Sequence, residues 1–170
     1  MGYVHLYYGD GKGKTTAALG LAFRASGWGK RSLIIQFMKK WEYGEFRAAM
    51  ENPLIEVKQF GIRRFIRKGE RPPELMEEIS KAMALAKEAA ESGKYDIIVL
   101  DEAAVAVYFG VLDEDDLLDF IDAYRDRVEI VITGRKASQR LIEKADLVTE
   151  MRKVKHYYDS GVTAREGIEY

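Results

Sequence analysis

The sequence predicts a single α/β domain with a mostly parallel β-sheet and helices on both faces. Apolar runs alternate with helical stretches along the whole chain, which is the order that builds such a sheet. The run Tyr95–Leu100 is almost continuously apolar, as expected of a strand covered on both faces. The length of 170 residues is that of one domain, and residues 1–170 contain no linker, low-complexity tract or internal repeat.

The first part of the chain begins with an apolar strand at Tyr3–Tyr8, which ends at a glycine cluster. A helix rich in Ala and Leu is expected at Lys14–Trp28, because Gly27 and Gly29 close it. The next segments are expected to be a strand, a short helix and a strand: Ser32–Met38, Tyr43–Met50 and Ile55–Phe60.

Residues 61–73 are expected to form a mobile surface loop within the domain. They include five Arg or Lys, two Gly and two Pro. A long helix should follow over residues 74–91, because apolar side chains recur there at helical spacing. The buried stripe of that helix is expected to consist of Leu75, Met76, Ile79, Met83 and Ala86.

The second part of the chain starts with the clearest strand, Tyr95–Leu100. The acidic run Asp113–Asp116 suits the positive start of a helix that extends to about Tyr124. A strand, a helix and a last strand should then follow at Val128–Thr133, Ser138–Lys144 and Leu147–Met151. Residues 152–170 are expected to form an irregular tail.

Composition excludes several kinds of chemistry. The chain has no cysteine, so disulfides, thiolate metal sites and cysteine nucleophiles are ruled out, and two histidines disfavour a multi-histidine metal site. The net charge of −1 gives no global attraction to nucleic acid or anionic lipid. We find no apolar run long enough to span a membrane and no secretory signal in Met1–Tyr8, so a cytoplasmic protein without membrane partners is expected.

The strongest motif is a glycine-rich loop between the first predicted strand and helix. Such a loop directs backbone N–H groups at phosphate, and the helix start adds partial positive charge. Lys14 is suited to phosphate oxygens and the Thr15 hydroxyl to Mg²⁺. The residues expected to bind nucleotide are Gly9, Asp10, Gly11, Lys12, Gly13, Lys14, Thr15 and Thr16.

This loop is one residue shorter than the usual phosphate loop. The common pattern places a glycine five residues before Gly13, where this chain has Tyr8, and the nearest earlier glycine is Gly9. A shorter loop cannot wrap a triphosphate in the usual way. The fold expectation is therefore a RecA-like P-loop domain whose loop departs from that of ordinary ATPases.

A pair of carboxylates, Asp101 and Glu102, follows the strand Tyr95–Leu100. Carboxyl ends of parallel strands meet at one sheet edge, so these groups should face the loop and hold Mg²⁺ directly or through water. Thr15 and Glu102 are the expected metal ligands, with Asp101 as a close alternative. A second interpretation is that the acidic pair caps the following segment.

In several blocks along nearly the whole chain, the sequence resembles the P-loop type of ATP:cob(I)alamin (corrinoid) adenosyltransferase. The family usually has Asn at the position of Asp10. The blocks that carry the resemblance, in chain order, are Gly9–Ala18, Gly20–Ala25, Gln36–Lys39, Leu100–Glu102, Thr133–Arg135, Ala145–Arg152, Val154–His156, Gly161–Val162 and Gly167–Tyr170.

The resemblance implies a transferase that moves the 5′-deoxyadenosyl group of ATP onto the Co(I) centre of a corrinoid and releases tripolyphosphate. It also implies Mg²⁺, an electron donor that reduces the cobalt, a homodimer, and ATP bound in reverse orientation, which fits the shortened loop. Lys14 and Glu102 would be the catalytic residues. Arg24 and Arg135 would contact the nucleotide, although each has an ordinary surface arginine as its alternative.

The resemblance also implies that an aromatic wedge from the mid-chain loop displaces the lower axial ligand of the corrinoid. Phe65 stands where the family has a Phe, but Arg67 stands where a Trp is expected. This departure leaves three alternatives: a different corrinoid form, a different wedge such as Trp41, or a shifted loop. Simple packing is the alternative for Phe65.

Two other functions explain part of the sequence. A RecA-like ATPase or kinase would use Lys14, Thr15 and Glu102 equally well, but it would not explain the shortened loop or the matching tail. A nucleotide-dependent binding module without turnover would suit the altered mid-chain loop. The histidines are expected to be structural: His5 in the first strand and His156 near the tail.

Overall fold

The computed structural model of the protein describes residues 2–41 and 43–170, and its centre is a six-stranded, all-parallel sheet. The strand order is β3-β2-β4-β5-β1-β6. The α/β class expected from the sequence is therefore confirmed. The strands are β1 (Val4–Tyr8), β2 (Ser32–Phe37), β3 (Ile55–Phe60), β4 (Ile97–Asp101), β5 (Glu129–Gly134) and β6 (Leu147–Glu150).

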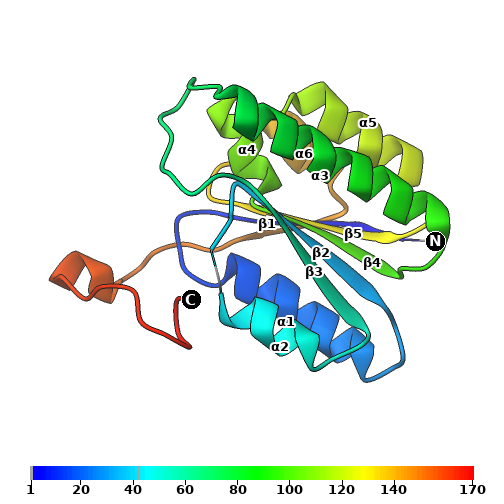
Figure 1. Ribbon diagram of the computed structural model, residues 1–170, viewed down its shortest axis with the longest axis horizontal. Helices are drawn as coiled ribbons and strands as arrows, with labels where there is room; N and C mark the ends of the chain where they lie inside the picture. The colour runs from blue at the N-terminus through cyan, green and yellow to red at the C-terminus, as the bar shows by residue number, and fades with distance from the viewer. Residues whose placement is uncertain (1, 42) are drawn as a thin grey trace.

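The helices cover both faces of the sheet (Figure 1), with α1 and α2 on one face and α3 to α6 on the other. The connections from β1 to β2 and from β3 to β4 run across the sheet in opposite directions. Right-handed crossovers then place their helices on opposite faces. The helices are α1 (Lys14–Ser26), α2 (Gly44–Met50), α3 (Pro73–Ser92), α4 (Ala103–Phe109), α5 (Glu114–Tyr124), α6 (Gln139–Lys144) and the short 3₁₀ helix η1 (Tyr157–Ser160).

The core follows from the alternation of side chains along the central strands. Ile34 and Val99 pack with Ala18 and Ala22 of α1, whereas Leu33 and other residues one position along the strands pack with α3 to α6. Both sets are buried. The apolar strands predicted from the sequence are therefore covered on both faces, as parallel strands require.

Helix α4 was not predicted from the sequence. It follows β4 without a loop, because Glu102 has the left-handed backbone angle φ 65° and turns the chain directly into the helix. Gly110, with φ 78°, ends it after seven residues. A segment this short and almost entirely apolar shows no alternation of apolar and polar residues at helical spacing, so its sequence does not indicate a helix.

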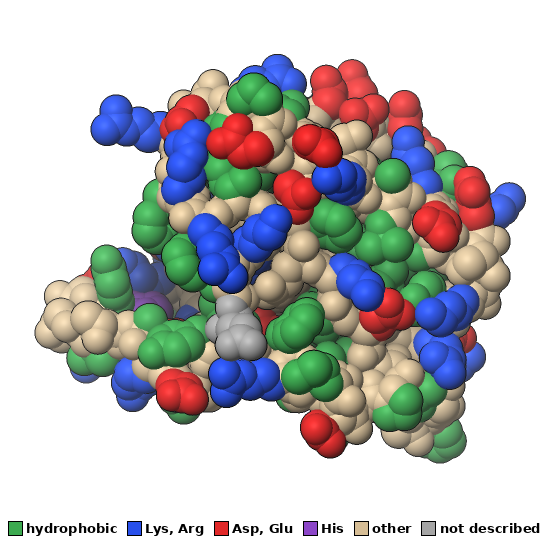
Figure 2. Space-filling view, in the orientation of Figure 1, with side chains coloured by type: hydrophobic (Ala, Val, Ile, Leu, Met, Phe, Trp, Pro, Cys, Tyr) green, Lys and Arg blue, Asp and Glu red, His purple; other side chains and the backbone are tan. Residues whose placement is uncertain are grey.

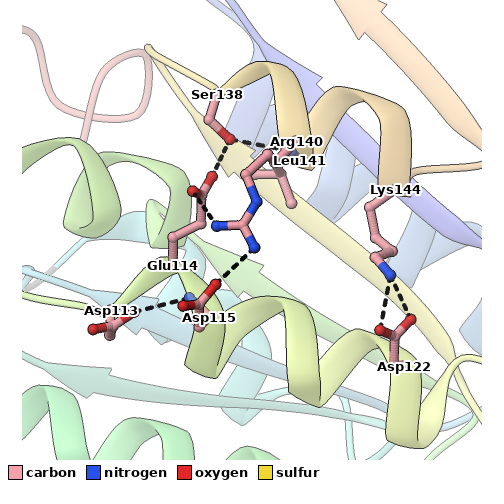
Figure 3. Close-up of polar contacts among 8 residues, drawn as sticks. All are labelled: Asp113, Glu114, Asp115, Asp122, Ser138, Arg140, Leu141 and Lys144. Carbon is pink, nitrogen blue, oxygen red and sulfur yellow. Dashed lines mark hydrogen bonds and ion pairs between the residues drawn. The ribbon is translucent and has the colours of Figure 1, made fainter.

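Salt bridges fasten α6 to α5 beside the sheet (Figure 3). The Glu114 carboxylate accepts hydrogen bonds from Ser138 and Arg140, and Arg140 also reaches Asp115 at 2.7 Å. Lys144 Nζ lies 2.7 Å from Asp122 Oδ1. Exposed pairs of this kind each contribute little to stability, and they connect α6 to α5.

All strands are parallel, so their carboxyl ends share one edge of the sheet. The loop after β1, the segment after β2, the loop of residues 61–72 after β3 and the turn after β4 all leave from this edge. Residues 61–72 contain no helix or strand, and the expected loop is present there. Among the described residues, no helix has the length and apolar character needed to cross a membrane.

Candidate functional site

The loop between β1 and α1 forms the floor of the candidate site. Gly9 and Gly13 have φ values of 110° and 119°, which only glycine adopts without strain. Gly13 is the residue before the first turn of α1, and Lys14 begins the helix. The free N–H groups of that turn therefore open toward the carboxyl edge of the sheet, where the partial positive charge of the helix start favours an anion.

Asp101 at the end of β4 is completely buried and is the centre of a polar network. Its Oδ1 accepts hydrogen bonds from the hydroxyls of Thr15 at 2.8 Å and Thr133 at 2.7 Å. Its Oδ2 accepts from Lys39 Nζ at 2.7 Å and from Gln36 at 3.2 Å. Burial alone would raise the pKa of the Asp101 carboxyl, but Lys39 and the hydroxyl donors hold it below its usual value.

Glu102 has a different environment, although it is the next residue. Its backbone N–H donates to Thr133 Oγ1 at 2.9 Å, and its partly buried side chain lines the pocket above the loop. No described side chain donates a hydrogen bond to its carboxylate. Burial, together with the charge of Asp101, raises the pKa of the Glu102 carboxyl. Of the two adjacent carboxylates, Glu102 is the one that faces the pocket and remains available to a ligand.

Lys14 is partly buried at the base of the same pocket. Its Nζ donates to the carbonyl of Gly11 at 2.7 Å, so the side chain folds back over its own loop. Burial lowers the pKa of the Lys14 ammonium, although the nearby carboxylate of Glu102 opposes that shift. An ammonium has three donors, so Lys14 retains donors for a phosphate group.

A pocket of about 470 Å³ joins these groups. Its polar lining includes the second half of the loop and Glu102, and its less polar lining includes Leu19 and Tyr43. The structure thus brings together five of the residues expected to bind nucleotide and one of the expected metal ligands outside the loop: Lys12, Gly13, Lys14, Thr15, Thr16 and Glu102.

The first half of the loop faces the segment after β6 instead of the pocket. A Cβ atom on Gly9 or Gly11 would lie 2.5 or 2.7 Å from the carbonyl oxygen of Met151, so neither position admits a side chain. The Gly11 N–H donates to that carbonyl at 2.7 Å, and the Asp10 carboxylate accepts from the Lys153 N–H at 3.0 Å. These contacts give the first glycines a packing role beside any role toward phosphate.

The two arginines expected at the nucleotide lie in different places. Arg135 is exposed just after β5, its carbonyl accepts from the Gly9 N–H at 3.3 Å, and its charge acts on both Lys14 and Glu102. Arg24 is exposed in the last turn of α1, about 15 Å along the helix from Lys14 at the standard rise per residue. The structure brings Arg135 near the site and leaves Arg24 outside the pocket.

The residues expected at the corrinoid lie in the loop of residues 61–72. Phe65 is 97% exposed, and the Arg67 N–H donates to Glu70 Oε2 at 2.9 Å. Neither residue lines the pocket that contains Lys14 and Thr15. Figure 2 shows basic side chains gathered on this face between that loop, at the upper left, and the tail, at the lower left.

Both histidines have structural partners. His5 Nε2 lies 2.6 Å from Glu129 Oε1, and Nδ1 of His156 accepts from the Tyr158 N–H at 3.1 Å, where it caps η1.

Some residues that shape the pocket were not identified as site residues from the sequence. Lys39 enters the pocket because Met38, with φ 58°, turns the chain sharply at the end of β2. Lys39 is nearly buried, and the carboxylates of Asp101 and Glu102 raise its pKa against the effect of burial. Its position just after a parallel strand was the signal that could have identified it. The pocket also includes the chain end, Gly167–Tyr170, which no sequence signal places there.

The described residues contain no group of three or more His, Asp or Glu side chains that could hold a metal by themselves. Thr15 and Glu102 fit the usual manner of Mg²⁺ binding, in which one or two protein oxygens supplement the phosphate oxygens of a nucleotide. The Thr15 hydroxyl donates its hydrogen to Asp101, so its oxygen lone pairs remain available.

Comparison with known proteins identifies the family of this chain. The family model described as "ATP:corrinoid adenosyltransferase BtuR/CobO/CobP" matches residues 1–170. The chain is 34% identical to the "Corrinoid adenosyltransferase" of Escherichia coli strain K12 over 172 residues, covering 99% of this chain and 86% of that protein. It is 33% identical to "Corrinoid adenosyltransferase CobA" of Salmonella typhimurium over 175 residues, with coverage of 99% and 86%. The chain therefore belongs to the ATP:corrinoid adenosyltransferase family.

Proposed function

We propose that this protein transfers the 5′-deoxyadenosyl group of ATP to the Co(I) centre of a corrinoid, in the biosynthesis or salvage of adenosylcobalamin. The observation that carries the proposal is the convergence of Lys14, Thr15 and Glu102 on one pocket in a chain that belongs to this family. Co(I) is itself the nucleophile, so the absence of any cysteine from the sequence is no obstacle.

In the proposed reaction, the electron pair of Co(I) forms a bond to the ribose C5′ as the C5′–O5′ bond breaks. The bonding electrons leave with the oxygen of tripolyphosphate, so the leaving group gains negative charge. The residues needed are therefore positioning groups and positive charges aimed at the phosphates. The N–H groups at the start of α1 and the Lys14 ammonium are suited to that task.

Thr15 and Glu102 are the residues we propose to hold Mg²⁺ together with phosphate oxygens. The bound ion would supply positive charge opposite the leaving group. Asp101 is already saturated by four donors, so we assign it the role of a positioning residue that fixes Thr15. Thr16 is proposed as a further group around the phosphates, and Arg135 as a cation at the same edge.

The corrinoid side of the site rests on fewer observations. Phe65 and Arg67 are proposed as corrinoid contacts because of their place in the family pattern, and the exposure of Phe65 leaves its ring free for a substrate. The reductase that supplies Co(I), the homodimer, the cytoplasmic location and the nucleotide contact by Arg24 stay predictions.

An anaerobic assay with ATP, Mg²⁺ and chemically reduced cobalamin tests the proposal, and the Lys14→Ala variant is its control. The expected result is a light-sensitive alkylcobalamin spectrum with one intact tripolyphosphate per turnover. If neither cobalamin nor incomplete corrinoids are adenosylated while inorganic phosphate is released steadily, an ATPase or kinase would be favoured. Bound but unreacted ATP would favour a nucleotide-dependent binding module.

A further inference from the structure

The end of the chain lies against the phosphate loop, although about 150 residues separate them in the sequence. Figure 1 shows the red C-terminal segment returning toward the starts of α1 and α2 after η1. The tail is attached to the loop at both of its ends. Near β6, Met151 and Lys153 bond to Gly11 and Asp10, and at the chain end Lys12 makes the contacts described next.

Lys12 holds the last residues of the chain. Its Nζ donates to the carbonyl of Ile168 at 2.7 Å and lies 3.4 Å from Glu169 Oε1. The sequence alone suggested a phosphate contact for this lysine, but its ammonium is directed at the tail. The residue between two glycines of the loop thus fixes the position of the C-terminal end.

The chain end is a closed turn and not a loose strand. The Gly167 N–H donates to the carbonyl of Tyr170 at 2.7 Å, and the Arg165 N–H donates to Glu169 Oε2 at 2.8 Å. The Tyr157 hydroxyl also donates to Glu169, and this bond, together with Arg165, lowers the pKa of the Glu169 carboxyl to about 2. Arg165 and Lys12 compensate the charge of Glu169, so the turn brings no unpaired side-chain carboxylate toward a triphosphate.

We propose that Gly167–Tyr170 forms a wall of the nucleotide pocket and that Lys12 is the positioning residue that holds this wall. The four residues line the same pocket as Lys14 and Thr15. The identity of the nucleotide as ATP rests on the proposed function above.

The pocket is lined by residues of two chemical kinds. Thr15, Thr16 and Lys14 provide donors for phosphate. Tyr43, Leu19, Ile168 and Tyr170 provide apolar and aromatic surface, which is the surface that a purine ring needs. The C-terminal wall is therefore assigned to the nucleoside part of the substrate.

The test compares four variants with the wild-type protein: Lys12→Ala, Lys12→Arg, a chain ending at Glu166, and that truncation combined with Lys12→Ala. Calorimetry gives the Kd of MgATP, and the transfer assay gives KM and kcat. The truncation and Lys12→Ala should each raise Kd and KM at least about tenfold, the loss expected from one charge-assisted contact, with kcat nearly unchanged. Lys12→Arg should keep most of the affinity.

The combined variant separates a positioning role from a direct phosphate contact. If Lys12 acts through the tail, the combined variant binds MgATP no more weakly than the poorer single variant. If the increases in Kd caused by Lys12→Ala and by the truncation multiply in the combined variant, the proposal is overturned, because Lys12 would then bind phosphate directly. Unchanged or tighter binding by the truncated chain would also overturn it, and tighter binding would identify the tail as a plug.

Two controls complete the experiment. Lys30→Ala removes an exposed lysine that pairs with Asp96 outside the pocket, and it should leave Kd unchanged. If the truncated chain does not fold, the Ile168→Ala, Tyr170→Ala double variant replaces it with the same expectations. Calorimetry requires neither corrinoid nor reduced cobalt, so a protein that binds MgATP without transferring adenosyl would refute the proposed function and leave this test intact.

Discussion

The phosphate-loop pocket and the loop of residues 61–72 differ in how completely the protein has organised them. The pocket rests on buried Asp101, whose two oxygens accept four hydrogen bonds from four elements or segments of the chain. The loop offers Phe65 with 97% of its surface exposed, and its clearest contacts are local ones to Glu70. Both leave the same sheet edge, but the polar side chains of the pocket are bound to a buried carboxylate, whereas the Phe65 ring extends into solvent.

If the pocket binds the nucleotide and the loop the corrinoid, as proposed, the nucleotide half of the site is preorganised and the corrinoid half depends on its ligand. Fixed donors aimed at a leaving group contribute to catalysis because they need no rearrangement during the reaction. A loop with few buried contacts can adapt to a bulky substrate, at an ordering cost when that substrate binds. Substitutions in the pocket should therefore have large effects, and substitutions in the loop smaller and more selective ones.

The largest effect is expected from Lys14→Ala. Removal of the ammonium takes away charge that stabilises the leaving tripolyphosphate, so turnover should fall at least about a hundredfold, as for other lost electrostatic stabilisers. Single-turnover rates with pre-reduced cobalamin measure the effect. Near-normal turnover in a folded Lys14→Ala protein would contradict the assigned role.

Lys39→Met tests whether the buried network organises the pocket. It leaves the Asp101 charge without its ammonium partner, and the free energy of unfolding should fall by roughly 3 kcal/mol, the lower end for a broken buried pair because Lys39 retains some exposure. Urea unfolding measures the change. The matched control is Lys81→Met, which breaks an exposed pair on α3 and should leave the midpoint where it was. Equal urea unfolding midpoints for the two variants would show that the buried network does not stabilise the fold.

Glu102→Gln should separate function from stability. The pKa of Glu102 is raised, so its ionised form costs the folded state free energy at neutral pH. The variant should lose Mg²⁺-dependent transfer but melt roughly 2–4 °C higher without Mg²⁺, the shift that about 1 kcal/mol produces in a chain of this size.

The gain in melting temperature should shrink as pH falls through the raised pKa. The wild-type side chain then binds a proton in the folded state and loses the same unfavourable charge. Melting curves between neutral and mildly acidic pH provide the check. A gain that is constant with pH would mean that the Glu102 charge does not destabilise the fold.

The smallest and most selective effect is expected from Phe65→Ala. The exposed ring contributes little to the folded state, so the melting temperature should not change. If the ring helps displace the lower axial ligand, reaction from Co(II) corrinoid should slow several-fold while reaction from pre-reduced Co(I) is affected less. Equal slowing of both reactions would remove Phe65 from that role.

Local sequence was sufficient for the α/β class and for most of the strands and helices. Apolar runs such as Tyr95–Leu100 predicted the covered parallel strands because burial on both faces leaves no polar alternation. Glycines and a lysine between a strand and a helix predicted the loop at the start of α1. Helix α4 was missed because it begins without a loop. The backbone of Glu102 is left-handed there, and glutamate has no preference for that conformation that would have predicted the turn.

The sequence by itself determined the strands, most of the helices and the position of the glycine-rich loop, because those depend on periodicity and on residues close together in the chain. Only the tertiary structure decided how Asp101 and Glu102 divide their roles, since one is enclosed by Lys39 and Thr133 and the other faces the pocket. Tertiary structure also directed Lys12 to the chain end. Contacts between segments about 150 residues apart depend on how the strands are ordered in space, and no local pattern encodes that order.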